Sequence, residues 1–155
     1  MTSATHLNIN VIDVQFGHRV KVIQPSNLYG CKLGDDVFIG PFVEIQSDVR
    51  IGARTKIQSH SFVCSLVSIG EDCFIGHGVM FVNDKMSSGA PAGGDKSMWK
   101  ATQLGCNVSI GSNSTIMPVR ICDGVLVGAG SVVTKDINSP GIYVGNPAKK
   151  LRSLP

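Results

Sequence analysis

The chain has 155 residues and a formal net charge of +3, so it fits one ordinary domain and is not basic enough to indicate nucleic-acid binding. Hydrophobic residues make up 43% and aromatic residues only 6%, with 18 glycines, which predicts a core of small and β-branched side chains. No run of eighteen apolar residues occurs and the N-terminus resembles no secretion leader, so we expect no membrane segment. The five cysteines form no C-x-x-C pair, which argues against a disulfide framework or zinc knuckle and favours a reducing cytoplasm.

The first 21 residues lack the regular pattern of the rest of the chain. Leu7, Ile9, Val11 and Phe16 indicate extended structure. We expect residues 1–21 to cap the open end of the domain, because an exposed terminal layer is prone to aggregation.

A six-residue repeat dominates the next part of the chain. Every sixth position carries an apolar anchor, and these anchors are Leu33, Ile39, Ile45, Ile51, Ile57, Val63, Ile69, Ile75 and Phe81. The residue after the anchor is often glycine, and the residue four positions after it is small or β-branched. Each unit therefore predicts a short strand with two inward positions and a turn that tolerates glycine, so that stacked coils bury one another.

The repeat is interrupted between residues 83 and 103, a segment rich in Gly, Ser, Lys and Met that contains Trp99. It resumes at Leu104, drops one residue near residues 117–119 and continues to Val133. The sequence therefore predicts one all-β domain over residues 1–155. We expect a solenoid of five or six coils, with a protruding loop at 83–103 and a short C-terminal tail at 139–155, and such a long loop in a compact solenoid is typically functional.

Three features together resemble the hexapeptide-repeat acyltransferases: the repeat itself, the segment ICDGVLVGAGSVVTKD at 121–136, and GNPAK at 145–149. The resemblance implies a left-handed parallel β-helix, a hand that spacing alone does not fix. It also implies acetyl-CoA as acyl donor and a homotrimer.

Within that family, the segments 56–62 and 73–85 are similar to N-acetyltransferases that act on nucleotide-linked amino sugars of the dTDP-3-amino-3,6-dideoxyhexose type. Those enzymes serve O-antigen and S-layer glycan synthesis, so the resemblance implies nucleotide sugar and acetyl-CoA as the small-molecule partners. No histidine occurs after His77, whereas galactoside O-acetyltransferases carry one in the protruding loop. O-acetylation of a small sugar or other acceptor is the alternative.

Four residues are candidates for the catalytic site. His60 and His77 follow anchors that lie eighteen residues, or one coil, apart, so we expect both imidazoles on one face of adjacent coils. Asn83 and Asp84 open the long loop and could orient a sugar amine, although both residue types are also ordinary in turns. Because a neutral amine is already a nucleophile, we expect orientation by Asn83 and Asp84 to matter more than a histidine base.

For coenzyme A the resemblance implies a line of backbone and cationic contacts. The residues are Gly111, Ser112 and Ala129 along the pantetheine arm, Thr134 and Lys135 at its far end, and Lys149 and Arg152 at the phosphates. Plain solenoid turns and solvated charges explain the same residues.

Two other classes of protein fit the repeat. A gamma-class carbonic anhydrase would bind zinc with three histidines, but His6 and His18 lie several coils from His60 and His77, so we expect no metal. A non-enzymatic solenoid that serves as an assembly module is the other possibility.

Overall fold

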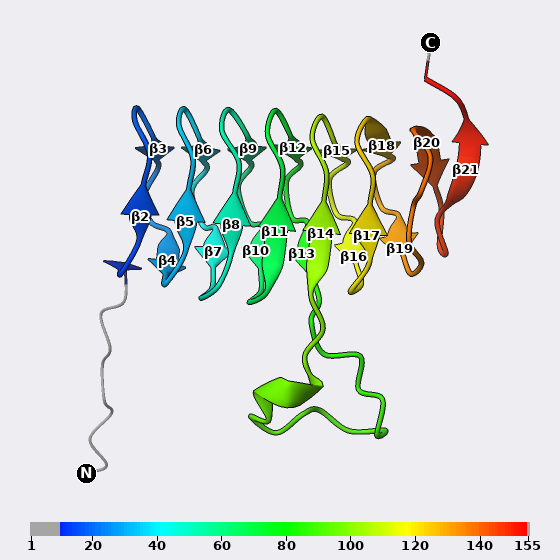
Figure 1. Ribbon diagram of the computed structural model, residues 1–155, viewed down its shortest axis with the longest axis horizontal. Helices are drawn as coiled ribbons and strands as arrows, with labels where there is room; N and C mark the ends of the chain where they lie inside the picture. The colour runs from blue at the N-terminus through cyan, green and yellow to red at the C-terminus, as the bar shows by residue number, and fades with distance from the viewer. Residues whose placement is uncertain (1–9, 155) are drawn as a thin grey trace.

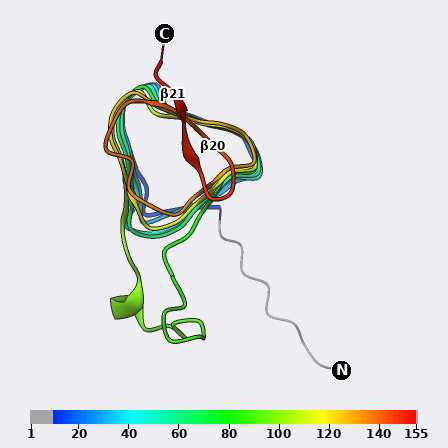
Figure 2. The same cartoon turned by 90° about the vertical axis from the view of Figure 1, so that its right-hand side faces the viewer.

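The computed structural model describes residues 10–154, which wind as a solenoid with three flat sides (Figure 1). The view along the axis shows the superimposed coils as a three-sided outline, from which one long loop projects (Figure 2). Each side of the solenoid is a β-sheet, and consecutive strands of the chain belong to different sheets.

The strands are short, and every neighbouring pair is parallel except β20 and β21, which are antiparallel. The seven-stranded sheet contains β1 (Val11–Ile12), β4 (Asn27–Tyr29), β7 (Glu44–Ile45), β10 (Phe62–Val63), β13 (Met80–Phe81), β16 (Thr115–Ile116) and β19 (Val132–Val133). The six-stranded sheet contains β2 (Gln15–Phe16), β5 (Lys32–Leu33), β8 (Arg50–Ile51), β11 (Val67–Ile69), β14 (Thr102–Leu104) and β17 (Arg120–Ile121). The eight-stranded sheet contains β3 (Lys21–Val22), β6 (Phe38–Ile39), β9 (Lys56–Ile57), β12 (Phe74–Ile75), β15 (Ser109–Ile110), β18 (Val125–Val127), β20 (Gly141–Val144) and β21 (Lys149–Arg152).

This architecture confirms the predicted all-β solenoid and is consistent with the left-handed β-helix. It has about seven coils rather than five or six. The additional coil lies at the N-terminus, where β1, β2 and β3 pair with β4, β5 and β6. The regular winding therefore starts at Val11, although Phe16 in this first coil is exposed rather than buried.

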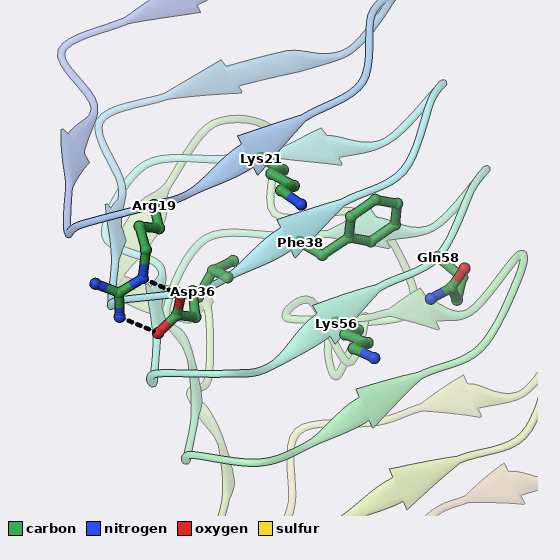
Figure 3. A pocket seen from close by; sticks show the side chains of 7 residues that line it. Arg19, Lys21, Asp36, Phe38, Lys56 and Gln58 are labelled. Atoms are coloured by element: carbon green, nitrogen blue, oxygen red, sulfur yellow. Dashed lines mark hydrogen bonds and ion pairs between the residues drawn. The ribbon is translucent and has the colours of Figure 1, made fainter.

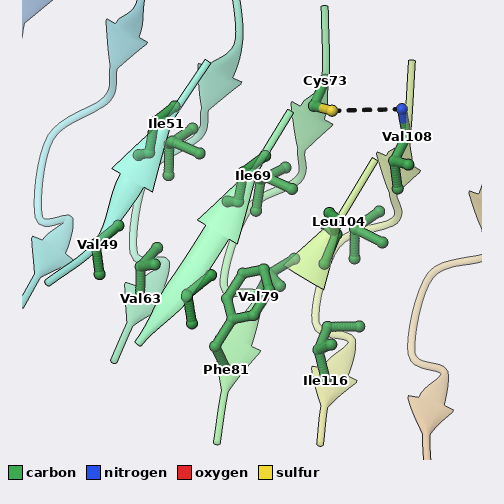
Figure 4. Packing of buried hydrophobic residues seen from close by; sticks show 14 of the residues in the cluster. Val49, Ile51, Val63, Ile69, Cys73, Val79, Phe81, Leu104, Val108 and Ile116 are labelled. Atoms are coloured by element: carbon green, nitrogen blue, oxygen red, sulfur yellow. Dashed lines mark hydrogen bonds between the residues drawn. The ribbon is translucent and has the colours of Figure 1, made fainter. Parts of the chain in front are cut away.

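The anchors of the repeat form the core (Figure 4). Because parallel pairing places each anchor beside its equivalent in the next coil, Ile57 pairs with Ile39 on one side and with Ile75 on the other, and all three are fully buried. From Leu104 onward the coil is one residue shorter, so Leu104 pairs with Ile121. The shortening lies at the segment 117–119 where the sequence pattern drops a residue.

The corners between sheets also recur every six residues, because each corner turns at a residue in the left-handed backbone conformation. Between positions 36 and 72 every sixth residue has a positive φ, and the residues are Asp36, Phe42, Asp48, Arg54, His60, Leu66 and Asp72. The glycines that follow anchors serve a different purpose, since a Cβ on Gly76 would lie 2.7 Å from the backbone nitrogen of Ser112 in the next coil. Glycine is thus required there for close stacking of coils, and not for the turn conformation.

The long loop leaves the solenoid after β13 and returns at β14, with a 3-10 helix η1 (Lys96–Met98) near its end. The backbone N–H of Lys100 donates to the carbonyl of Asn83 at 2.8 Å and closes the base of the loop. The ammonium group of Lys96 lies 5.8 Å from the centre of the Trp99 ring. At the C-terminus the tail folds as the β20–β21 hairpin and not as a helix.

Candidate active site

The turns that lead from the eight-stranded sheet to the seven-stranded sheet stack along one edge of the solenoid. We call four consecutive turns the histidine corner; they contain residues 59–60, 77–78, 112–113 and 129–130. Backbone hydrogen bonds connect them, since Gly78 donates to Ser59 O at 3.0 Å and Asn113 donates to His77 O at 2.8 Å. His60 and His77 therefore lie in adjacent coils, offset by one residue.

His77 is exposed at this corner and is held by two serines. Its Nδ1 lies 2.8 Å from the hydroxyl oxygen of Ser59, and its backbone N–H donates to the hydroxyl oxygen of Ser112 at 3.2 Å. When Nδ1–H donates to Ser59, the other ring nitrogen, Nε2, is free to accept a proton. Ser59 thus orients the ring, and in the tautomer that carries hydrogen on Nδ1 the imidazole can act as a base at Nε2.

His60 has different surroundings. It occupies the left-handed turn position with φ 62°, and its ring stacks on the ring of Phe42 with 4.9 Å between centroids. This contact to an aromatic ring of the preceding coil packs one face of the imidazole. The geometry favours His77 over His60 as the reactive imidazole.

Asn83 and Asp84 lie at the base of the long loop. The Asn83 side-chain amide donates to the carbonyl of Ser65 at 3.2 Å. Both carboxylate oxygens of Asp84 accept backbone N–H groups of the loop, from Met86 at 2.8 Å and from Ala92 at 2.7 Å. These bonds from Ala92 and Met86 lower the pKa of Asp84, so its carboxylate stays charged and shapes the loop.

The histidines and the loop residues lie at opposite ends of one strand. His77 precedes β13 and Asn83 follows it, and the six residue steps from one to the other span up to about 20 Å when extended. Within one chain the two groups do not converge. They could serve one site only if a second copy brought its own corner beside the first.

The residues implied for coenzyme A fall into three places. Gly111, Ser112 and Ala129 lie at or beside the histidine corner, on the C-terminal side of His77. Gly111 stacks closely on the backbone of Ala129, whereas a Cβ on Gly130 would meet nothing within 4 Å, so the space beside Gly130 is open. Thr134 and Lys135 are exposed directly after β19. Lys149 and Arg152 are exposed on β21 at the C-terminal end of the solenoid.

The buried cysteines are poor nucleophiles. Burial raises the pKa of Cys64 to about 12 and that of Cys31 to about 11, so both thiols stay protonated near neutral pH. Across residues 10–154 no three His, Cys, Asp or Glu side chains gather in a way that could hold a metal ion. In the same range no helix is long and apolar enough to cross a membrane.

Ser59 is a side chain of this corner that bonds a candidate histidine and that the sequence pattern did not single out. It lies eighteen residues before His77, which is one full coil, so the spacing that relates the two histidines would also have found it. The sequence pattern also missed a groove beside Gln58 on the eight-stranded sheet.

Comparison with known proteins agrees with this fold. The profile described as bacterial transferase hexapeptide (six repeats) matches residues 30–65. The profile described as hexapeptide repeat of succinyl-transferase matches residues 66–80 and 102–135. Together the two matches cover more than half of the chain, and the chain belongs to the hexapeptide-repeat transferase family.

Three relatives illustrate the likeness. The bifunctional protein GlmU of Acidithiobacillus ferrooxidans is 32% identical over an alignment of 163 positions that covers 89% of this chain and 36% of GlmU. Perosamine N-acetyltransferase from Caulobacter crescentus, in complex with CoA and GDP-perosamine, has a TM-score of 0.73 and 21% identity, covering 86% of this chain and 57% of that one. A hexapeptide-repeat acetyltransferase from Vibrio cholerae, complexed with acetyl coenzyme A, has a TM-score of 0.65 and 25% identity, covering 90% and 70%. The chain spans about a third of the length of the curated relative.

Proposed function

We propose that the chain is an acetyl-CoA-dependent N-acetyltransferase of the cytoplasm. Its acceptor is the amino group of a nucleotide-linked amino sugar, of the dTDP-3-amino-3,6-dideoxyhexose type, for O-antigen or S-layer glycan synthesis. The observation that carries the proposal is the exposed imidazole of His77, oriented by Ser59, with open space beside Gly130 on its C-terminal side.

The comparisons support this class of reaction. A hexapeptide-repeat acetyltransferase at 25% identity is a complex with acetyl coenzyme A, and a structural relative with the same fold is a complex with CoA and GDP-perosamine. Both ligands are of the kinds that the proposal assigns to this chain.

His77 supplies the proton chemistry. Bound acetyl-CoA would provide the acetyl group as a thioester. Nε2 of His77 would accept the proton that the sugar amine loses as its C–N bond forms, while the C–S bond breaks and the thiolate leaves. The imidazolium can then return that proton to the departing sulfur, which balances the reaction.

The residues of this chain suit the donor. An extended pantetheine arm could lie along the open corner at Ser112 and Ala129, where no side chain blocks the backbone at Gly130. The exposed cations Lys135, Lys149 and Arg152 could bind its phosphates, together with Thr134.

The active unit in this proposal is a homotrimer. Asn83 is at the far end of β13 from His77, so a site that uses both needs two subunits. Heterologous contacts that close around a threefold axis would place one subunit's loop against its neighbour's histidine corner.

The test is a matched pair of acceptors. A nucleotide-linked 3-amino sugar and the same sugar with a 3-hydroxyl group are each incubated with acetyl-CoA, and products are identified by mass spectrometry. The proposal predicts acetylation of the amine alone. Acetylation of the hydroxyl sugar at a similar rate would favour the O-acetyltransferase alternative.

A further inference from the structure

A groove of about 530 Å³ lies on the outer face of the eight-stranded sheet, over its N-terminal coils (Figure 3). Its volume is within the range of small-molecule sites. The buried Val37 forms part of its lining, and its polar lining comes from Lys21, Lys56 and Gln58 together with the paired Arg19 and Asp36. Phe38 lies in the middle of it.

Parallel pairing creates the arrangement of these side chains. Lys21 on β3 pairs with Phe38 on β6, and Phe38 pairs with Lys56 on β9. With strands spaced by ~4.8 Å, the two lysine backbones are roughly 10 Å apart on either side of the phenylalanine. Figure 3 shows the Phe38 ring with Lys21 on one side and Lys56 and Gln58 on the other.

Among residues 10–154 neither lysine belongs to an ion pair, since the ion pairs join Arg19 to Asp36, and Arg54 to Glu71 and Asp72. Arg19 and Asp36 bond each other at the edge of the groove, with 2.7 Å from Nε and 2.6 Å from Nη2 to the two carboxylate oxygens. The hydrogen bond from Arg19 lowers the pKa of Asp36, and the positive charge of Lys21 contributes to that shift. The groove therefore offers an anion two ammonium groups outside any ion pair, beside an aromatic face.

The groove leads to the reactive corner. Gln58 lines it, and the next residue, Ser59, bonds the imidazole of His77 at 2.8 Å. His77 thus separates two regions, with the groove on the N-terminal side and the open backbone of Ser112 and Ala129 on the C-terminal side.

We propose that this groove binds the nucleoside diphosphate of the acceptor, an inference that rests on the proposed function. The diphosphate lies between Lys21 and Lys56, the base stacks on Phe38, and the amide of Gln58 bonds a polar edge of the ligand. The sugar then extends past Gln58 toward His77. We assign the groove to the nucleotide of the acceptor because the proposed function places coenzyme A on the opposite side of His77.

The experiment measures binding without turnover. Isothermal titration of the full chain with dTDP, UDP and GDP, in the absence of acetyl-CoA, gives the affinity for nucleoside diphosphates, and adenosine 3′,5′-bisphosphate serves as the probe for the donor. Lys21→Ala, Lys56→Ala and Phe38→Leu should each weaken binding of the preferred nucleoside diphosphate about tenfold. Lys32→Ala is the matched control, because Lys32 is also an exposed lysine before a buried anchor but lies on the six-stranded sheet.

The expected result is weakened nucleoside diphosphate binding in the three groove variants, unchanged binding in Lys32→Ala, and unchanged affinity for adenosine 3′,5′-bisphosphate in all four. Three results would overturn the proposal: no nucleoside diphosphate bound at millimolar concentration, equal binding by wild type and groove variants, or groove variants that lose adenosine 3′,5′-bisphosphate instead. Acetylation of a free amino sugar by a protein that binds no nucleoside diphosphate would leave the acetyltransferase intact and remove only the groove assignment.

Discussion

His60 and His77 occupy neighbouring turns of one corner, yet only His77 has a hydrogen-bonded partner on its ring. Ser59 holds its Nδ1 at 2.8 Å, whereas the His60 ring packs against Phe42. Asp84, which the sequence favoured as an orienting group, has both carboxylate oxygens bonded to the loop backbone. These contacts lead us to propose His77 as a base. The expectation from sequence that orientation by Asn83 and Asp84 matters more stays a prediction, which kinetics can decide.

Replacement of His77 by asparagine should therefore lower kcat by about 10²-fold or more and remove the acidic limb of the pH profile. His60→Asn, the matched control in the adjacent turn, should change kcat far less. Ser59→Ala should give an intermediate loss, because it frees the ring without removing it. Steady-state kinetics across pH 6 to 9 on one amino sugar would measure all three. The contrary result would be that His77→Asn raises only the Michaelis constant while Asn83→Ala causes the larger loss of kcat. It would show that no protein base is needed.

At the scale of elements, the long loop depends on two turns built by aspartates. Asp84 accepts from Met86 and Ala92, and Asp95 caps the 3-10 helix by accepting from the backbone N–H of Ser97. Hydrogen bonds lower the pKa of both carboxyls below the ordinary value of 3.8. Because the folded pKa is the lower one, the stabilisation is complete above about pH 3.8 and is lost as the pH falls through the lowered pKa.

Trp99 is the only tryptophan of the chain and lies within this loop, so its fluorescence reports the loop. We expect acid titration of the wild type to change Trp99 emission below pH 3.8, while Asp84→Asn shows the altered emission already at neutral pH. Asp48→Asn, a change at an exposed solenoid corner, should behave as wild type. Identical titration curves for the wild type and Asp84→Asn would contradict a structural role of this carboxylate.

The sequence predicted the elements well wherever one residue type repeats at one inward position. The anchors from Leu33 to Phe81 are all buried, and the interruption after residue 83 is a projecting loop. The first coil was not recognised, because its Phe16 is exposed and no aliphatic run marks it. The groove was missed for a different reason: Lys21, Phe38 and Lys56 each read as a surface residue, and only strand pairing brings them together.

At the scale of the whole molecule, the separation of His77 from Asn83 along β13 makes the proposed site depend on assembly. If each site takes His77 from one subunit and Asn83 from its neighbour, a subunit lacking either residue can still complete a site with the right partner. The monomer should therefore be inactive, and light scattering should give three times the chain mass.

Subunit exchange tests this directly. His77→Asn and Asn83→Ala are each expected to be nearly inactive, but mixing them after reversible dissociation should restore activity at about one quarter of the sites for random trimers. A mixture of His77→Asn with Ser59→Ala is the control, since both residues come from the same corner of one subunit. Its activity should not exceed the mean of the two variants measured separately. No recovery in the first mixture, with trimers formed, would show that the two residues do not share a site between subunits.

We propose above all that this solenoid transfers an acetyl group from acetyl-CoA to a sugar amine. The most direct measurement follows free thiol release from acetyl-CoA and the acetylated product together, in one reaction with a nucleotide-linked 3-amino sugar. We predict one thiol released for each acetylated sugar, and loss of both signals in His77→Asn. Two results together would contradict the proposed acetyl transfer. A trimeric protein would release no thiol with any amino sugar tested, and acetyl-CoA would not raise its melting temperature.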